Sequence, residues 1–250
     1  MPSVARLEAA ALATWPALET VTDGQWQARF ASGFSGRANS IWCLDPADDA
    51  NAEARLATLA TAYQARSLAP VFRVTPLTGR STFASLQSLG WAAFQSSLVL
   101  SMPLPETAEP APAAQLYDAA DPAFLAIEAD LQGFEGARLD AFSAIVRAID
   151  APACGLVIAD ETGAPAAALI CALSEDIAMV YDVITAKPQR GQGFGRRIME
   201  AALAWAVDHK ARHAALQVRA DNHAALGLYL SLGFTFRYPY HYRRSPETSL

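Results

Sequence analysis

The segment RGQGFG, residues 190–195, lies between two stretches whose patterns predict regular structure. Before it, residues 176–185 read DIAMVYDVIT, an apolar run typical of a strand, and after it residues 196–210 carry apolar side chains at helical spacing. A glycine turn that opens a helix offers unpaired amides and the positive end of the helix dipole to an anion. Arg190 and Arg196 add positive charge. The segment therefore predicts a loop that binds a pyrophosphate.

Two familiar nucleotide-binding loops do not fit this segment. A dinucleotide-binding fold needs the pattern G-x-G-x-x-G, but here the third glycine comes one residue early and Arg196 takes its place. A Walker loop ends in Gly-Lys-Ser/Thr, which is absent from residues 190–196. A plain glycine turn with no ligand is the alternative interpretation.

A second group of residues downstream completes a recognisable pattern. The first signature is formed by Arg190, Gly193 and Gly195, and the second by Asn222, Ala225, Tyr229, Gly233 and Phe234. In this order and separation, the residues resemble the two motifs of the GCN5-related N-acetyltransferase family. The resemblance covers about residues 115–243. It implies an α/β (α+β) fold, with a mixed central β-sheet flanked by helices.

The resemblance also implies a binding site for acetyl-CoA as co-substrate. In the family this molecule lies where two neighbouring parallel strands splay apart, which here would be residues 176–185 and 214–220. The Val183 N–H would donate to the thioester carbonyl, as a preorganised oxyanion donor does. The residues expected to bind the cofactor are Val183, Ile184, Thr185, Arg190, Gly191, Gln192, Gly193, Phe194, Gly195, Arg196 and Asn222.

Tyr229 is the residue we expect to be catalytic, as the general acid that protonates the leaving thiolate. The alternative is a core aromatic residue on an apolar helix face. Asn222 precedes the helical pattern HAAL, so it could also cap that helix.

The sequence departs from the family resemblance at the position of the general base. Many family members carry a glutamate on the long strand, eleven residues before the motif arginine, and this chain has Met179 there. Strand alternation predicts that Tyr181 shares a face with Met179 and Val183, and that Asp182 points the other way. We expect Tyr181, and Glu135 in the segment GFEG, to line the acceptor site. Glu135 is also a candidate for the base, and a chain of water molecules could serve as well.

The N-terminal half carries no visible chemistry. The proline-rich segment 103–114 predicts a linker between an N-terminal domain, 1–102, and a catalytic domain, 115–250. Residues 86–91, LQSLGW, resemble residues 229–234, YLSLGF. This similarity could reflect any helix-to-strand turn, or a tandem arrangement in which the first, smaller α/β domain is a degenerate copy of the second.

Composition excludes several classes of protein. The 250 residues carry a net charge of −6, which argues against a nucleic-acid binder, and no apolar run is long enough to span a membrane. The three cysteines form neither a disulfide framework nor a zinc pattern, so we expect a cytoplasmic protein. His209 and His213 have metal-ligand spacing but no third ligand, so we expect no metal.

The sequence therefore predicts an N-acetyltransferase. We expect it to move an acetyl group from acetyl-CoA to a primary amine of a small molecule or a peptide, by direct attack in a ternary complex. A non-catalytic acyl-CoA-binding sensor and a chiefly structural protein are the alternatives. We expect a monomer, with a homodimer as the alternative.

Overall fold

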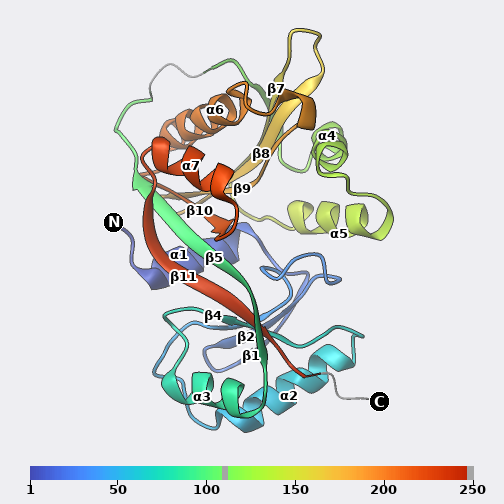
Figure 1. Cartoon of the computed structure of the whole chain (residues 1–250), viewed down its shortest axis with the longest axis vertical. Helices are drawn as coiled ribbons and strands as arrows, with labels where there is room; N and C mark the ends of the chain where they lie inside the picture. The colour runs from blue at the N-terminus through green and yellow to red at the C-terminus, as the bar shows by residue number, and fades with distance from the viewer. Residues whose placement is uncertain (109–111, 247–250) are drawn as a thin grey trace. The chain divides into compact units, whose positions relative to one another are not determined.

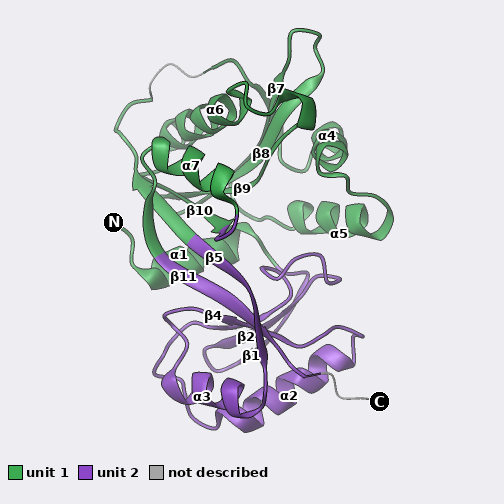
Figure 2. Cartoon of the chain, viewed as in Figure 1, with its two compact units in different colours: residues 1–16, 99–218, 222–237 green, residues 17–98, 219–221, 238–250 purple. Residues whose placement is uncertain are grey.

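A computed structural model describes residues 1–108 and 112–246 of the chain. The chain forms two compact units, coloured separately in Figure 2. Unit 1 contains residues 1–16, 99–218 and 222–237, and unit 2 contains residues 17–98, 219–221 and 238–250. Neither unit is continuous in sequence, whereas the expected division was 1–102 and 115–250. Part of the expected linker, residues 109–111, lies outside the described residues.

Unit 1 is built on a mixed sheet in which the strands follow the order β11-β5-β10-β9-β8-β7-β6 (Figure 1). Its strands are β5 (Ala92–Pro103), β6 (Gln115–Asp118), β7 (Ala153–Ala159), β8 (Pro165–Ser174), β9 (Ile177–Thr185), β10 (His213–Arg219) and β11 (Thr235–Arg244). Its helices are α1 (Val4–Thr14), α4 (Pro122–Gln132), α5 (Gly136–Arg147), α6 (Phe194–Asp208), α7 (His223–Ser231) and the short 3₁₀ turn η1 (Lys187–Gln189).

The centre of unit 1 is apolar along whole strands. Residues 166–172 of β8 are all buried, as expected for a strand covered on both faces of its sheet. Helices α1, α4 and α6 all pack on β8 and β9. The buried face of α6 includes Ile198, Met199 and Trp205 at helical spacing. The sheet and the helices that position the site therefore belong to one core.

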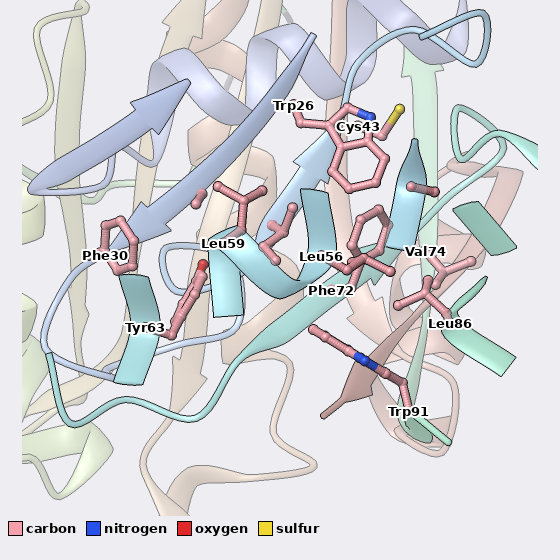
Figure 3. Close-up of a cluster of buried hydrophobic side chains, with 13 residues drawn as sticks. Trp26, Phe30, Cys43, Leu56, Leu59, Tyr63, Phe72, Val74, Leu86 and Trp91 are labelled. Atoms are coloured by element: carbon pink, nitrogen blue, oxygen red, sulfur yellow. The ribbon is translucent and has the colours of Figure 1, made fainter. Parts of the chain in front are cut away.

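Unit 2 is smaller and has its own core. Its strands are β1 (Glu19–Asp23), β2 (Trp26–Phe30), β3 (Ile41–Cys43) and β4 (Val71–Val74), followed in the sheet order by β11 and β5, which contribute residues to both units. Its helices are α2 (Ala52–Gln64) and α3 (Arg80–Ser88). Figure 3 shows the buried side chains of this core, among them Trp26, Phe72 and Trp91. The rings of Trp26 and Phe72 meet edge to face, with 5.4 Å between their centroids.

The two halves of the chain repeat an order of elements. In one half, parallel strands β3 and β4 flank α2 and are followed by α3 and β5. In the other, parallel strands β9 and β10 flank α6 and are followed by α7 and β11. The two helix ends also share a capping pattern, since Trp91 N donates to Leu86 O at 2.9 Å and Phe234 N to Tyr229 O at 3.1 Å. This repeat supports the interpretation of a degenerate first copy.

The strands predicted at 176–185 and 214–220 and the helices predicted at 196–210 and after Asn222 are present as β9, β10, α6 and α7, and the α+β fold class is confirmed. The prediction missed strands β1 and β6 and the turn η1. Within the described ranges, no helix combines the length and apolar character that crossing a bilayer requires.

Candidate active site

The site is centred on strands β9 and β10, which part from each other. Their parallel register runs from His213 opposite Ile177 to Leu216 opposite Val180 and ends there. Both strands continue, to Thr185 and Arg219. The segment 181–185, which carries three of the residues expected to bind the cofactor, thus lies beyond the last residue pair of the two strands. This is the splayed arrangement that the family resemblance predicts.

A β-bulge interrupts β9 in the same segment. Ile170 of β8 pairs with Tyr181 and Ala168 pairs with Ile184, so Asp182 and Val183 together oppose one residue. Asp182 adopts a φ of 49°, a left-handed conformation that few residues other than glycine adopt. Strict alternation does not hold across such a bulge. The prediction that Tyr181 and Val183 share a face, opposite Asp182, was therefore wrong.

Tyr181 lies in the interior of unit 1. Only 1% of its surface is exposed, its ring centroid is 4.9 Å from that of Trp15, and its hydroxyl is 2.7 Å from Thr14 Oγ1. These contacts make Tyr181 part of the packing between α1 and β9, which argues against the expected place in an acceptor site.

The glycine loop has the geometry of an anion cradle. Gly191 and Gly193 have φ angles of 77° and 84°, and a Cβ added at either would meet nothing within 4 Å. Gly193 O accepts from Arg196 N and Arg197 N at 3.1 and 3.0 Å, which are the first bonds of α6. The amides of Gly193, Phe194 and Gly195 precede those donors in the helix. The loop therefore presents open backbone and unused amides, which fits a pyrophosphate.

The side chains around the loop hold its ends. Arg190 Nε donates to Thr185 O at 3.3 Å, which joins the loop to the end of β9. Arg196 donates to Ser231 Oγ at 2.6 Å, and Gln192 Nε2 donates to Pro188 O at 2.9 Å. Both arginines are exposed, and Arg196 Nη1 also lies 3.6 Å from Glu200 Oε1, so the charge of Arg190 is the more available to an anion at the loop.

Tyr229 is placed by α7 and has the properties of an acid. It is 7% exposed and packs against Phe234 with 6.1 Å between ring centroids. Burial, and next to it the charge of Asp182, raises the pKa of Tyr229 to about 12. The phenol therefore keeps its proton at neutral pH, as a general acid must. Asp182, whose charge contributes to this raised pKa, is the residue at the bulge of β9.

Asn222 acts as a helix cap in this structure. Its side-chain oxygen accepts from Ala225 N at 3.2 Å, at the start of α7. The helix-capping role considered for Asn222 is therefore present. The capping bond uses Oδ1, so the side-chain nitrogen can still contact a cofactor.

One acidic residue at the site escaped the sequence analysis. Glu128 lies on the buried face of α4 with no exposed surface, and burial raises its pKa well above the usual range. Its Oε1 accepts from Gln132 Nε2 at 2.9 Å, while its Oε2 has no hydrogen-bond partner among the described residues. Gln132 Nε2 also donates to Asp182 O at 3.0 Å. The spacing of Glu128 and Gln132 on an apolar helix could have indicated this pair.

The structure thus brings together the bulge of β9, Tyr229 and the pair of Glu128 and Gln132 on α4.

Glu135 is exposed in the turn between α4 and α5, where its side chain makes no capping hydrogen bond. His209 stacks on Trp205 and His213 lies 3.7 Å from Asp176. In the described part of the chain, no group of three or more His, Cys, Asp or Glu side chains could hold a metal ion.

Comparisons with known proteins point to one family. The model of a family described as "Probable histone acetyltransferase Rv0428c C-terminal" matches residues 3–243. The chain is 24% identical over 251 residues to "Uncharacterized N-acetyltransferase YobR" of Bacillus subtilis (strain 168), covering 97% of this chain and 99% of that protein.

Solved structures share the fold. A GCN5-related N-acetyltransferase from Kribbella flavida superposes with a TM-score of 0.71 at 18% identity, over 100% of this chain and 98% of that chain. A tandem GNAT protein from the clavulanic acid biosynthesis pathway gives a TM-score of 0.64 at 15% identity, over 84% of this chain and 74% of that one. The family model spans nearly the whole chain, and these structures agree with it in fold. The chain is an acyltransferase that belongs to the GCN5-related N-acetyltransferases, in the family described as probable histone acetyltransferase Rv0428c C-terminal.

Proposed function

We propose that this protein transfers an acetyl group from acetyl-CoA to a primary amine. The observation that carries the proposal is the end of the β9–β10 register at Val180, directly before a bulge and next in sequence to the glycine cradle that opens α6. When bound, acetyl-CoA supplies an activated acyl carbon. The amides of Gly193 to Gly195 and the charge of Arg190 and Arg196 suit its pyrophosphate.

The residues of the chain suit each part of direct transfer. The amine nitrogen attacks the thioester carbon, the Val183 N–H stabilises the oxyanion that forms, and the C–S bond then breaks. Tyr229 gives its proton to the departing sulfur, for which its raised pKa keeps it protonated. The amine attacks as the neutral group, so its ammonium form first gives one proton to water, and the nitrogen gives a second proton to water as the C–N bond forms. Water then returns one proton to the Tyr229 phenolate.

Initial-rate kinetics test direct transfer. With acetyl-CoA and amine both varied, a ternary complex gives intersecting double-reciprocal lines, and mass spectrometry finds no acetylated enzyme in the absence of amine. Parallel lines together with an acetyl group on the protein would refute direct attack, because they indicate a covalent intermediate.

The acceptor class follows from a panel of amines. We propose a primary amine, on a small molecule or a peptide, and the family description, a probable histone acetyltransferase, suits the peptide side of this range. A panel of polyamines, amino acids and basic peptides separates the two. We further propose that Glu135 borders the acceptor, and that the chain acts as a monomer, which light scattering tests.

A sensor without turnover is the second candidate, and one observation favours it. Met179 occupies the strand position at which many family members carry the basic glutamate, and its side chain is fully buried. Tight binding of acetyl-CoA with no transfer to any amine of the panel would support the sensor.

A further inference from the structure

The bulge of β9 is held from outside its own sheet. Gln132, the last residue of α4, donates through Nε2 to the carbonyl oxygen of Asp182 at 3.0 Å and to Glu128 Oε1 at 2.9 Å. We propose that Gln132, held by Glu128, is a positioning residue that orients the peptide bond between Asp182 and Val183, and with it the Val183 N–H. The inference rests on the proposed function, in which that N–H faces the thioester carbonyl.

Peptide geometry connects the two groups. The peptide bond is planar, and no cis bond occurs in the described chain, so the Asp182 carbonyl and the Val183 N–H point in opposite directions. When Gln132 draws the carbonyl toward α4, it turns the N–H away from α4. The direction of the oxyanion donor is thus set by a side chain that does not touch the reacting atoms.

The strand itself fixes this peptide weakly. Asp182 and Val183 fall between the pairs Ile170–Tyr181 and Ala168–Ile184, so the regular ladder with β8 is interrupted here. Asp182 also holds a φ of 49°, a conformation that persists in a residue with a side chain only when its surroundings enforce it. The hydrogen bond from Gln132 on α4 to the Asp182 carbonyl helps to hold Asp182 in this conformation.

Glu128 determines which end of the Gln132 amide faces the strand. An amide nitrogen has two protons, and here one goes to Asp182 O and the other to Glu128 Oε1. If the amide turned over, its oxygen would face the Asp182 carbonyl oxygen, which repels it. Glu128 has no exposed surface, so its carboxyl group is held in place by packing.

The test uses Gln132→Leu, which keeps the size of the side chain and removes both donors. We expect kcat to fall about 10- to 100-fold, since loss of a whole oxyanion donor costs about 100- to 1,000-fold and here the donor is only misdirected. Acetyl-CoA affinity by calorimetry changes by less than about 3-fold, because the pyrophosphate cradle is intact. Gln64→Leu, at the exposed last residue of α2 in unit 2, is the matched control and leaves both unchanged.

Infrared spectra provide a readout that is independent of turnover. With acetyl-CoA labelled with ¹³C at its thioester carbonyl, the wild-type protein shifts the carbonyl band to lower frequency, because the Val183 N–H polarises the bond. Gln132→Leu moves the band back toward its position in free acetyl-CoA. Glu128→Leu should also lower kcat and move the band back toward free acetyl-CoA. Glu128→Gln keeps an oxygen for the Gln132 amide, so its kcat and its band should stay close to those of the wild-type protein.

Several results would overturn the inference. If Gln132→Leu shows the wild-type band and the wild-type kcat, the side chain does not position the donor. If Glu128→Gln loses as much as Glu128→Leu, the acidity of Glu128 matters rather than its hold on Gln132. Should Gln132→Leu fail to fold, Gln132→Asn, whose amide is too short to reach both partners, is read by the same two measurements. A wild-type protein with no band shift and no transfer would instead refute the proposed function.

Discussion

Replacing Gly193 by alanine should separate binding at the loop from the stability of the loop. Gly193 has a φ of 84°, so an alanine there is strained by about 1–2 kcal/mol. At about 2–4 °C per kcal/mol for a chain of this size, the melting temperature should fall by about 2–8 °C. The new Cβ meets no protein atom within 4 Å, so the only further effect is on a ligand that approaches this backbone.

The expected loss of affinity follows from the contact that the methyl group disturbs. A hydrogen bond from an amide to a charged group contributes about 1.5–3 kcal/mol. Losing one such bond to the pyrophosphate weakens acetyl-CoA binding about 10- to 100-fold. Calorimetric titration measures this change, and thermal unfolding without ligand measures the strain.

The chain contains a matched control for this substitution. Gly163, in the turn between β7 and β8, has a φ of 86° and the same open space around its Cβ position. Gly163→Ala should lower the melting temperature by a similar amount and leave acetyl-CoA affinity unchanged. If Gly193→Ala binds acetyl-CoA as tightly as Gly163→Ala does, residues 190–195 are not the pyrophosphate loop.

Three further predictions address the neighbouring groups. Tyr229→Phe should lower kcat about 100-fold while acetyl-CoA affinity stays within about 3-fold, and an unchanged kcat would remove the residue from the chemistry. Arg190→Glu should weaken acetyl-CoA binding strongly because it places a negative charge beside the pyrophosphate, whereas Arg212→Glu, near the other end of α6, should not; equal losses would contradict the loop assignment. Glu128→Gln should stabilise the fold increasingly as pH rises. The folded-state pKa of Glu128 is raised, so the wild-type protein is favoured below the unfolded pKa and loses that advantage as pH rises through the folded one. Thermal unfolding of both proteins between about pH 5 and about pH 8 measures the difference, and a constant difference would contradict a raised pKa.

The sequence predicted the local features of the fold well. RGQGFG was correctly placed between a strand and a helix, because glycines and the apolar periodicity around them act locally. Strand β1, ETVTD, was missed since it is polar and has no buried residue, and β6 has only four residues at an edge of the sheet. Such strands exist through pairing with a neighbour, which a single segment does not reveal.

The features missed at the site depend on contacts between distant segments. Aspartate adopts the left-handed conformation more readily than most residues, but its type alone does not predict it at Asp182, where the bulge breaks the alternation used to orient Tyr181. Glu128 and Gln132 lie four residues apart on an apolar helix, but this spacing alone does not separate a buried carboxyl from a surface one. The discontinuous units arise because β11 pairs with β4, as in His241 opposite Val74, across most of the chain.

The central claim is that this chain binds acetyl-CoA and passes the acetyl group to an amine. The most direct measurement is calorimetric titration of the purified protein with acetyl-CoA, followed by release of free thiol from the same sample across the panel of amines. We predict saturable binding and stoichiometric thiol release with one class of primary amine, matched by an acetylated product. Absence of binding would contradict the assignment of the loop and the splayed strands, and binding with no thiol release on any amine would contradict transfer.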